Sequence, residues 1–128
     1  MLQLPFPTNC LNWILGHIVA RRNTALELVG AQSIWGEEIL SRYRSGSEPI
    51  RDAKTARRLE DLTEDLAESQ RRIAEALDGV LEAVLERNAE TDRGVKPVWQ
   101  HLQGLHWHET FHIGQLEVLK DYALSRRT

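Results

Sequence analysis

A short run towards the carboxyl end of the chain holds residue types that can bind a metal ion. The run is HWHETFHIGQL, residues 106–116, and within it HETFH places His108 and His112 four residues apart. Residues four apart share one face of a helix, so both imidazoles could bind one ion. H-E-x-x-H is also the pattern of zinc peptidases, in which the Glu, here Glu109, acts as the general base.

The residues that follow this motif do not fit a zinc peptidase. Such an enzyme takes its third ligand from a Glu or a His beyond the motif. Glu117 lies on the same predicted helix as His112 and is rotated away from it. The extended metzincin pattern needs Gly and His where this chain has Gln115 and Val118. We therefore expect any third ligand to lie upstream of the motif.

His17 is the upstream candidate. It lies beside the apolar face of a helix predicted over residues 9–29, and His112 falls within the apolar stripe of a helix predicted over residues 98–124. A single histidine on an apolar face is most often a core residue bonded to a carbonyl. Three of them on two facing helices could meet at one point. Neutral imidazoles suit zinc, nickel, cobalt or iron(II) and leave coordination positions open.

The remaining histidines and the one cysteine are weaker ligand candidates. His101 lies about 10 Å along the helix from His108, too far to share its ion. His106 points to another face, where we expect a solvated side chain. Cys10 is two turns from His17, and a closed structural zinc site usually takes four ligands including cysteine. The predicted site is therefore an open one.

Residues close to the three histidines could support the site. Trp13 lies one turn before His17 and could wall the pocket or simply pack in the core. Gln115 could hydrogen-bond near the site, and Gly114 would allow close helix packing. Glu109 is a weak candidate for a catalytic base, with a solvated surface carboxylate as the alternative.

Composition excludes several classes of protein. The chain has 128 residues, with 41% hydrophobic and 27% charged, and a net charge of −3, which argues against nucleic acid as a partner. The most apolar run, residues 10–20, is too short to span a membrane, and the N-terminus lacks a basic signal-peptide region. A single cysteine excludes an internal disulfide. We expect a cytoplasmic protein.

Helical periodicity dominates the chain. Sustained alternation is absent, as are Asn-Gly and Asp-Gly hairpin turns, so NAETDRGVKP is expected to be a loop. In the last helix Phe111 is expected to face inward, and a bend is expected near Gly79. The whole chain, residues 1–128, is predicted to be one all-α domain, an antiparallel helical bundle. The predicted helices cover residues 9–29, 53–88 and 98–124, and residues 33–44 are predicted to form a short helix or a turn-rich segment.

Two segments carry a resemblance to a known family. TNCLNWILGHIVARRNTALELVG, which holds His17, and HETFHIGQLEVLK, which begins at His108, resemble segments of the DinB/YfiT-like superfamily of helical-bundle metalloproteins. The resemblance covers residues 9–122, and its last motif is the more specific of the two.

This resemblance implies a four-helix bundle with a three-histidine site for a divalent metal, most often nickel or zinc, with iron or manganese as further options. The implied ligands are His17, His108 and His112. Some members of the family are transferases or isomerases that use a low-molecular-weight thiol and a small electrophile, and many form dimers.

The chain departs from the family at its beginning. Family members usually have a helix before the segment that holds His17, and here that first helix is expected to be missing or supplied by a partner subunit. We therefore expect a homodimer or higher oligomer. The main hypothesis is a metal-dependent hydrolase or thiol S-transferase. The alternative is a non-catalytic oligomeric bundle whose metal is structural or absent.

Overall fold

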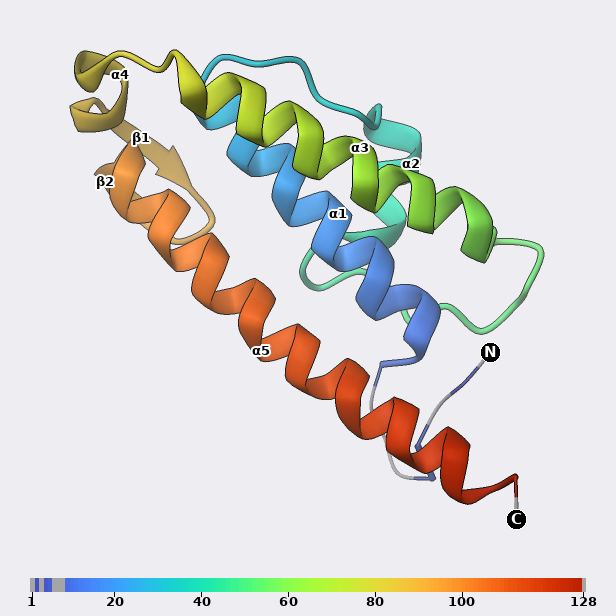
Figure 1. The fold of residues 1–128 in the computed structure, drawn as a ribbon. Coiled ribbons are helices and arrows are strands. Elements are labelled where there is room, and N and C mark those ends of the chain that lie inside the picture. Colours follow the sequence, from blue (N-terminus) through green and yellow to red (C-terminus); the bar gives the residue numbers. More distant parts are fainter. Residues whose placement is uncertain (1, 3, 6–8, 128) are drawn as a thin grey trace.

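The chain is predominantly helical, as predicted. The computed structural model describes residues 2, 4, 5 and 9–127, and within them five helices and one two-stranded sheet follow each other along the chain (Figure 1). The elements are α1 (Leu11–Leu28), α2 (Glu37–Tyr43), α3 (Leu59–Asp78), α4 (Glu82–Glu86), β1 (Asn88–Thr91), β2 (Gly94–Pro97) and α5 (Val98–Ser125).

Helix α1 is the centre of the molecule. It lies between α3 and α5 and packs against both (Figure 1). Most of its side chains are buried, including Ile14, Ile18 and Leu26, because an apolar helix with neighbours on two sides has little face left for solvent. Even so, no helix in the described part of the chain is both long and apolar enough to cross a membrane.

The three long helices do not all alternate in direction. Helix α5 runs antiparallel to α1, but α3 runs parallel to it (Figure 1). Asn12 Nδ2 near the start of α1 donates to the carbonyl of Arg57 just before α3, and Arg22 further along donates to the carbonyl of Leu66. The expectation of a fully antiparallel bundle is therefore wrong for this pair. Helix α2 and the segment after it carry the chain back to the starting end.

The long helix predicted over residues 53–88 is shorter and interrupted. Helix α3 begins at Leu59 and ends at Asp78, with Gly79 as its C-terminal cap, and α4 follows as a separate turn of helix. The apolar spacing continues past Gly79, but glycine is a poor helix former. The helix therefore ends at this position, where only a bend was expected.

A β-hairpin stands where a loop was expected. Strands β1 and β2 pair antiparallel, with Thr91 opposite Gly94. Asp92 and Arg93 make the turn, and Gly94 has a φ of 92°. Glycine tolerates this left-handed conformation, so Gly94 can follow the two turn residues and begin β2 directly. The turn carries Asp-x-Gly in place of Asp-Gly, so the absence of an Asp-Gly pair did not exclude a hairpin.

One face of α5 is buried and the opposite face is not. The buried residues Val98, His101, Leu105, His112 and Leu119 follow one another at steps of three, four or seven. Phe111 was expected to face inward but is 54% exposed, so that expectation is wrong. A Cβ added at Gly114 would meet nothing within 4 Å, so this glycine does not serve close helix packing either.

Candidate metal centre

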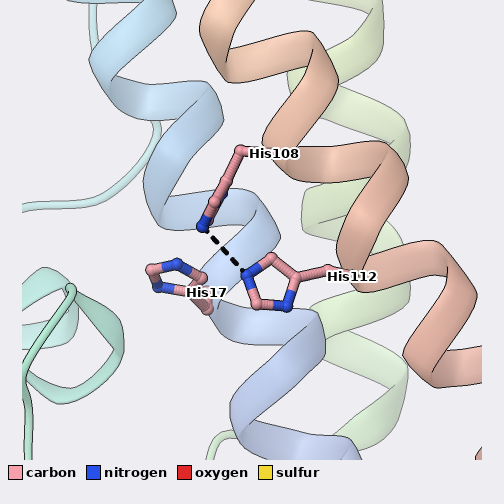
Figure 2. Close-up of side chains that lie close together, drawn as sticks. All are labelled: His17, His108 and His112. Atoms are coloured by element: carbon pink, nitrogen blue, oxygen red, sulfur yellow. Dashed lines mark hydrogen bonds between the residues drawn. The ribbon is translucent and has the colours of Figure 1, made fainter.

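Three histidines meet between α1 and α5. His17 projects from α1, while His108 and His112 project from successive turns of α5 towards it (Figure 2). Their ring centroids lie 4.4 Å apart for His108 and His112, and 4.9 and 5.1 Å from His17 to the two α5 rings. The structure thus brings together the three predicted ligands, which are ninety-one and ninety-five positions apart in the chain.

The ligand nitrogens lie close together, and one pair has the spacing that a shared cation imposes. One ligand nitrogen from each ring can be chosen so that all lie within 4.8 Å of one another. His108 Nε2 and His112 Nε2 are 3.1 Å apart. Nitrogens that share a zinc ion at ~2.0–2.1 Å lie roughly 2.9–3.4 Å from each other. Among the described residues, no carboxylate or thiol joins this cluster.

A backbone carbonyl fixes the protonation of His17. Its Nδ1 lies 2.7 Å from the carbonyl oxygen of Tyr43, and a carbonyl only accepts, so Nδ1 carries the proton and donates. The lone pair is then on Nε2, as a metal ligand requires. His17 is only 2% exposed, so neither water nor ring motion readily disturbs this arrangement.

Gly16 is what lets Tyr43 come so close to α1. A Cβ at this position would lie 2.2 Å from the ring of Tyr43, far inside contact distance. The Tyr43 hydroxyl is also fixed, since it donates to Asn12 Oδ1 and accepts from the backbone N–H of Arg57. Packing of the ring on Gly16 and the hydrogen bonds of the hydroxyl together fix Tyr43, and with it the carbonyl that orients His17.

His112 is oriented in the same way from its own helix. Its Nδ1 donates to Gln115 Oε1 at 2.7 Å, which leaves the lone pair on Nε2. Gln115 was predicted to hydrogen-bond near the site, and this contact confirms it. His108 differs, because its Nδ1 is buried and has no hydrogen-bond partner among the described residues. The His108 side chain is partly buried, and no acceptor among the described residues orients its ring as Tyr43 and Gln115 orient the other two.

Burial keeps all three imidazoles neutral at physiological pH. Burial lowers the pKa of His17 to about 4, against the Tyr43 hydrogen bond, which raises it. Burial likewise lowers the pKa of His108 to about 4, with the charges of His112 and His17 adding to the effect. The pKa of His112 is lowered as well, again chiefly by burial. Neutral imidazole is the form that binds metals.

Trp13 packs in the core and also covers one face of the His17 ring. It stacks on His17 with the ring centroids 4.4 Å apart and the planes at 11°, and it is buried. Its Nε1 donates to Ser47 Oγ at 2.9 Å. An indole on one face of the imidazole prevents His17 from turning away from the cluster.

Glu109 lies beside the cluster in sequence but not in space. Arg22 donates from Nε and Nη2 to its two carboxylate oxygens, at 3.1 and 2.5 Å. The same guanidinium donates to the Leu66 carbonyl and to Ser69 Oγ. This arrangement joins α1, α3 and α5, so the contacts of Glu109 favour a structural role over that of a catalytic base.

The other histidines lie apart from the cluster, as expected. His101 is buried under the hairpin, where its Nε2 donates to the Ala89 carbonyl at 2.8 Å. His106 is exposed. Cys10 is buried, and its thiol lies 3.8 Å from the carbonyl oxygen of Ile50, away from the three imidazoles.

Two supporting residues were not predicted from the sequence. Tyr43 orients His17 from 26 positions away, and Arg21 lies one turn after His17 on the same face. The glycine at position 16, in the middle of an apolar helix and next to a histidine, was the available signal for a close packing partner.

Known proteins offer no independent guide to this centre. Comparisons of the chain with protein-family models, with curated proteins and with solved structures give no match.

Proposed function

We propose that the chain binds one divalent cation through His17, His108 and His112, and that it is a metal-dependent enzyme. The observation that carries this proposal is the set of three neutral imidazoles with ligand nitrogens within 4.8 Å, two of them turned by protein acceptors so that Nε2 carries the lone pair. Three nitrogen ligands suit zinc or nickel, with iron or manganese as alternatives, and leave positions for water or substrate.

A cation held this way supplies Lewis acidity and lowers the pKa of a bound water or thiol. The protein's part is to hold the three rings in a dry, fixed arrangement. Tyr43 and Gln115 set the orientation of His17 and His112, and Trp13 shields one face of His17. This favours a hydrolase or a thiol-dependent transferase that joins a low-molecular-weight thiol to a small electrophile.

We also propose that the chain belongs with the DinB/YfiT-like bundles, and the same geometry supports this. The site draws one histidine from an early helix and two from the last helix, as the resemblance implies. A cytoplasmic location belongs to this proposal, because low-molecular-weight thiols and the single Cys10 both suit a reducing compartment.

Cobalt(II) titration tests the proposal directly, because the visible spectrum of cobalt reports its ligands. We expect one cobalt per chain, with bands that are absent in His108→Ala and present in the control His106→Ala. Addition of mercaptoethanol should produce a thiolate-to-cobalt band. Turnover of electrophiles that persists in His108→Ala, or in fully chelated protein, would contradict a metal-dependent enzyme.

A second candidate function is that of an oligomeric bundle without catalysis. It is favoured by an exposed apolar stripe on α5, made of Trp107, Phe111 and Val118, which are 68%, 54% and 54% exposed. These residues lie four and seven positions apart and so share one face. A second copy of the chain would cover this stripe. Light scattering should then give a dimer, and a monomer at micromolar concentration would contradict it.

A further inference from the structure

Arg21 is a buried cation close to the histidine cluster with hydrogen-bonding capacity to spare. It lies one turn after His17 on α1 and is 8% exposed. Its Nη1 donates to both carboxylate oxygens of Asp92, at 3.0 and 3.3 Å. Its Nε is buried and has no partner among the described residues. Burying a guanidinium N–H without an acceptor is costly, so this atom points to a missing partner.

Arg21 opens onto a cleft of about 660 Å³ between α1 and the hairpin. One wall is α1, on the face that carries His17 one turn earlier. Another is the end of α2, where Arg44 follows the Tyr43 whose carbonyl orients His17. The cleft therefore lies one helical turn from His17 and next to Tyr43 in the chain, although none of the three histidines lines it. The charged residues of its lining are Arg21, Arg44, Arg87, Glu27, Glu90 and Asp92.

Asp92 lines this cleft from the hairpin turn. Its side chain is 52% exposed, whereas that of Arg21 is 10% exposed. An ion pair with one half-exposed partner contributes little to stability, because water competes for the carboxylate. Exchange of Asp92 for another carboxylate would thus cost little, and a ligand that also reached Nε would satisfy the buried donor.

We propose that the cleft binds a small molecule with a carboxylate, which Arg21 holds in place of Asp92 while the rest of the molecule reaches the histidine cluster. The guanidinium fork matches a planar carboxylate. The lining carries three arginines against Glu27, Glu90 and Asp92, so its charges balance and favour a singly charged group over a phosphate dianion. The carboxylate site at Arg21 does not depend on the proposed function. Only the contact between the other end of the ligand and the metal rests on it.

A matched pair of thiols tests the inference in cobalt-loaded protein. Mercaptoacetate and mercaptoacetamide place the same thiol on the metal but differ in charge at the other end. We expect calorimetry to show mercaptoacetate binding roughly ten- to hundredfold more tightly, as for other charge-assisted hydrogen bonds. The preference should vanish in Arg21→Gln and remain in Arg58→Gln, whose exposed side chain lies outside the cleft.

Equal affinity for the two thiols, or a preference that survives in a folded Arg21→Gln, would overturn the inference. Asp92→Asn provides a second test, which keeps Arg21 and removes only the charge of the carboxylate that competes for it. Removal of the competing carboxylate should tighten mercaptoacetate binding severalfold and leave mercaptoacetamide unchanged. Weaker mercaptoacetate binding in Asp92→Asn would contradict the proposal that the carboxylate of the ligand replaces that of Asp92 on Arg21.

A metal-free experiment separates failure of this inference from failure of the proposed function. In chelated protein, propionate should shift the NMR signal of the Arg21 Nε–H group, whereas propionamide should leave it in place. A signal unmoved by propionate overturns the carboxylate site even if cobalt binds. Absence of cobalt binding overturns the metal proposal but leaves this readout intact.

Discussion

Helix α5 buries histidines in two places, and their surroundings differ. His101, near its start, is held by the hairpin, with Nε2 against the Ala89 carbonyl and Nδ1 3.4 Å from Thr91 Oγ1. His108 and His112, two to three turns later, face each other through Nε2 atoms 3.1 Å apart. His101 has a protein partner for each nitrogen, whereas the other two rings direct nitrogens at one another and at His17.

This comparison shows why burial alone does not identify a metal ligand. A buried polar group needs partners, and the kind of partner reveals its role. His101 has partners of the sort that serve a core histidine, namely a carbonyl that accepts from Nε2 and a hydroxyl that can donate to Nδ1. The cluster has acceptors on the outer nitrogens of His17 and His112, and lone pairs on the inner ones. The following predictions test this distinction in order of decreasing effect.

The largest contrast should come from removal of His17 compared with removal of His101. His17→Ala should weaken zinc binding by more than the ten- to hundredfold that loss of a supporting residue costs. His101→Ala should leave zinc affinity unchanged and lower the melting temperature, because the carbonyl of Ala89 loses its donor. Competition with a chelating dye measures the affinity. An equal loss of zinc affinity in both variants would contradict the distinction between a ligand histidine and a core histidine.

The pH dependence of stability should separate the cluster from the rest of the chain. The folded-state pKa of His17 is about 4 and its ordinary value is 6.5, so between these values the unfolded chain binds more protons. The free energy of unfolding of metal-free protein should therefore fall as the pH drops from 6.5 to 4. The contribution of His17 alone is about 3 kcal/mol. Above pH 6.5 this contribution stays constant.

Urea unfolding of chelated protein at several pH values measures this effect. His17→Gln should show a flatter profile than the natural chain over the same interval, since the residue that resists protonation is gone. Identical profiles for the two proteins would mean that His17 does not carry the predicted burial cost.

Two glycines give an opposed pair of outcomes. Gly16→Ala should destabilise the fold by ~1–3 kcal/mol, because the new Cβ would overlap the Tyr43 ring. It should weaken zinc binding too, since the displaced Tyr43 carbonyl orients His17. Gly114→Ala is the matched control on α5, where the Cβ meets open space, and should stabilise by ~0.5–1 kcal/mol. Thermal unfolding of both variants measures the difference.

The smallest effect should come from Gln115. In Gln115→Ala the Nδ1 of His112 loses its acceptor, but the ligand itself remains, so zinc affinity should fall roughly tenfold. Gln115→Glu supplies a stronger acceptor and should retain or improve affinity. A loss in the glutamate variant as large as in the alanine variant would contradict orientation by this hydrogen bond.

The sequence predicted what depends on local periodicity. The apolar spacing located α1 and α5 within two residues at each end, and the four-residue step of His108 and His112 made their shared face certain on any helix. Placement of His17 opposite them needed only two antiparallel helices. The helix bounds and the histidine cluster could be predicted because all the residues concerned lie on α1 and α5, two regular helices.

The rest depends on how irregular segments fold. Nothing in the spacing showed that α2 and the loop after it would return the chain and make α3 parallel to α1. Phe111 fits the apolar pattern of α5, yet α1 covers only one side of that helix, so the ring stays outside. The Tyr43 carbonyl is a backbone group, and its use by His17 depends on tertiary packing over Gly16.

The central claim is that the cluster of His17, His108 and His112 holds a metal while His101 does not, and elemental analysis of tag-free protein tests it most directly. The account predicts about one divalent ion per chain in the natural protein and in His101→Ala. It predicts loss of that ion in His112→Ala that is still folded by circular dichroism. A natural protein that stays free of metal after incubation with zinc and nickel would contradict the account.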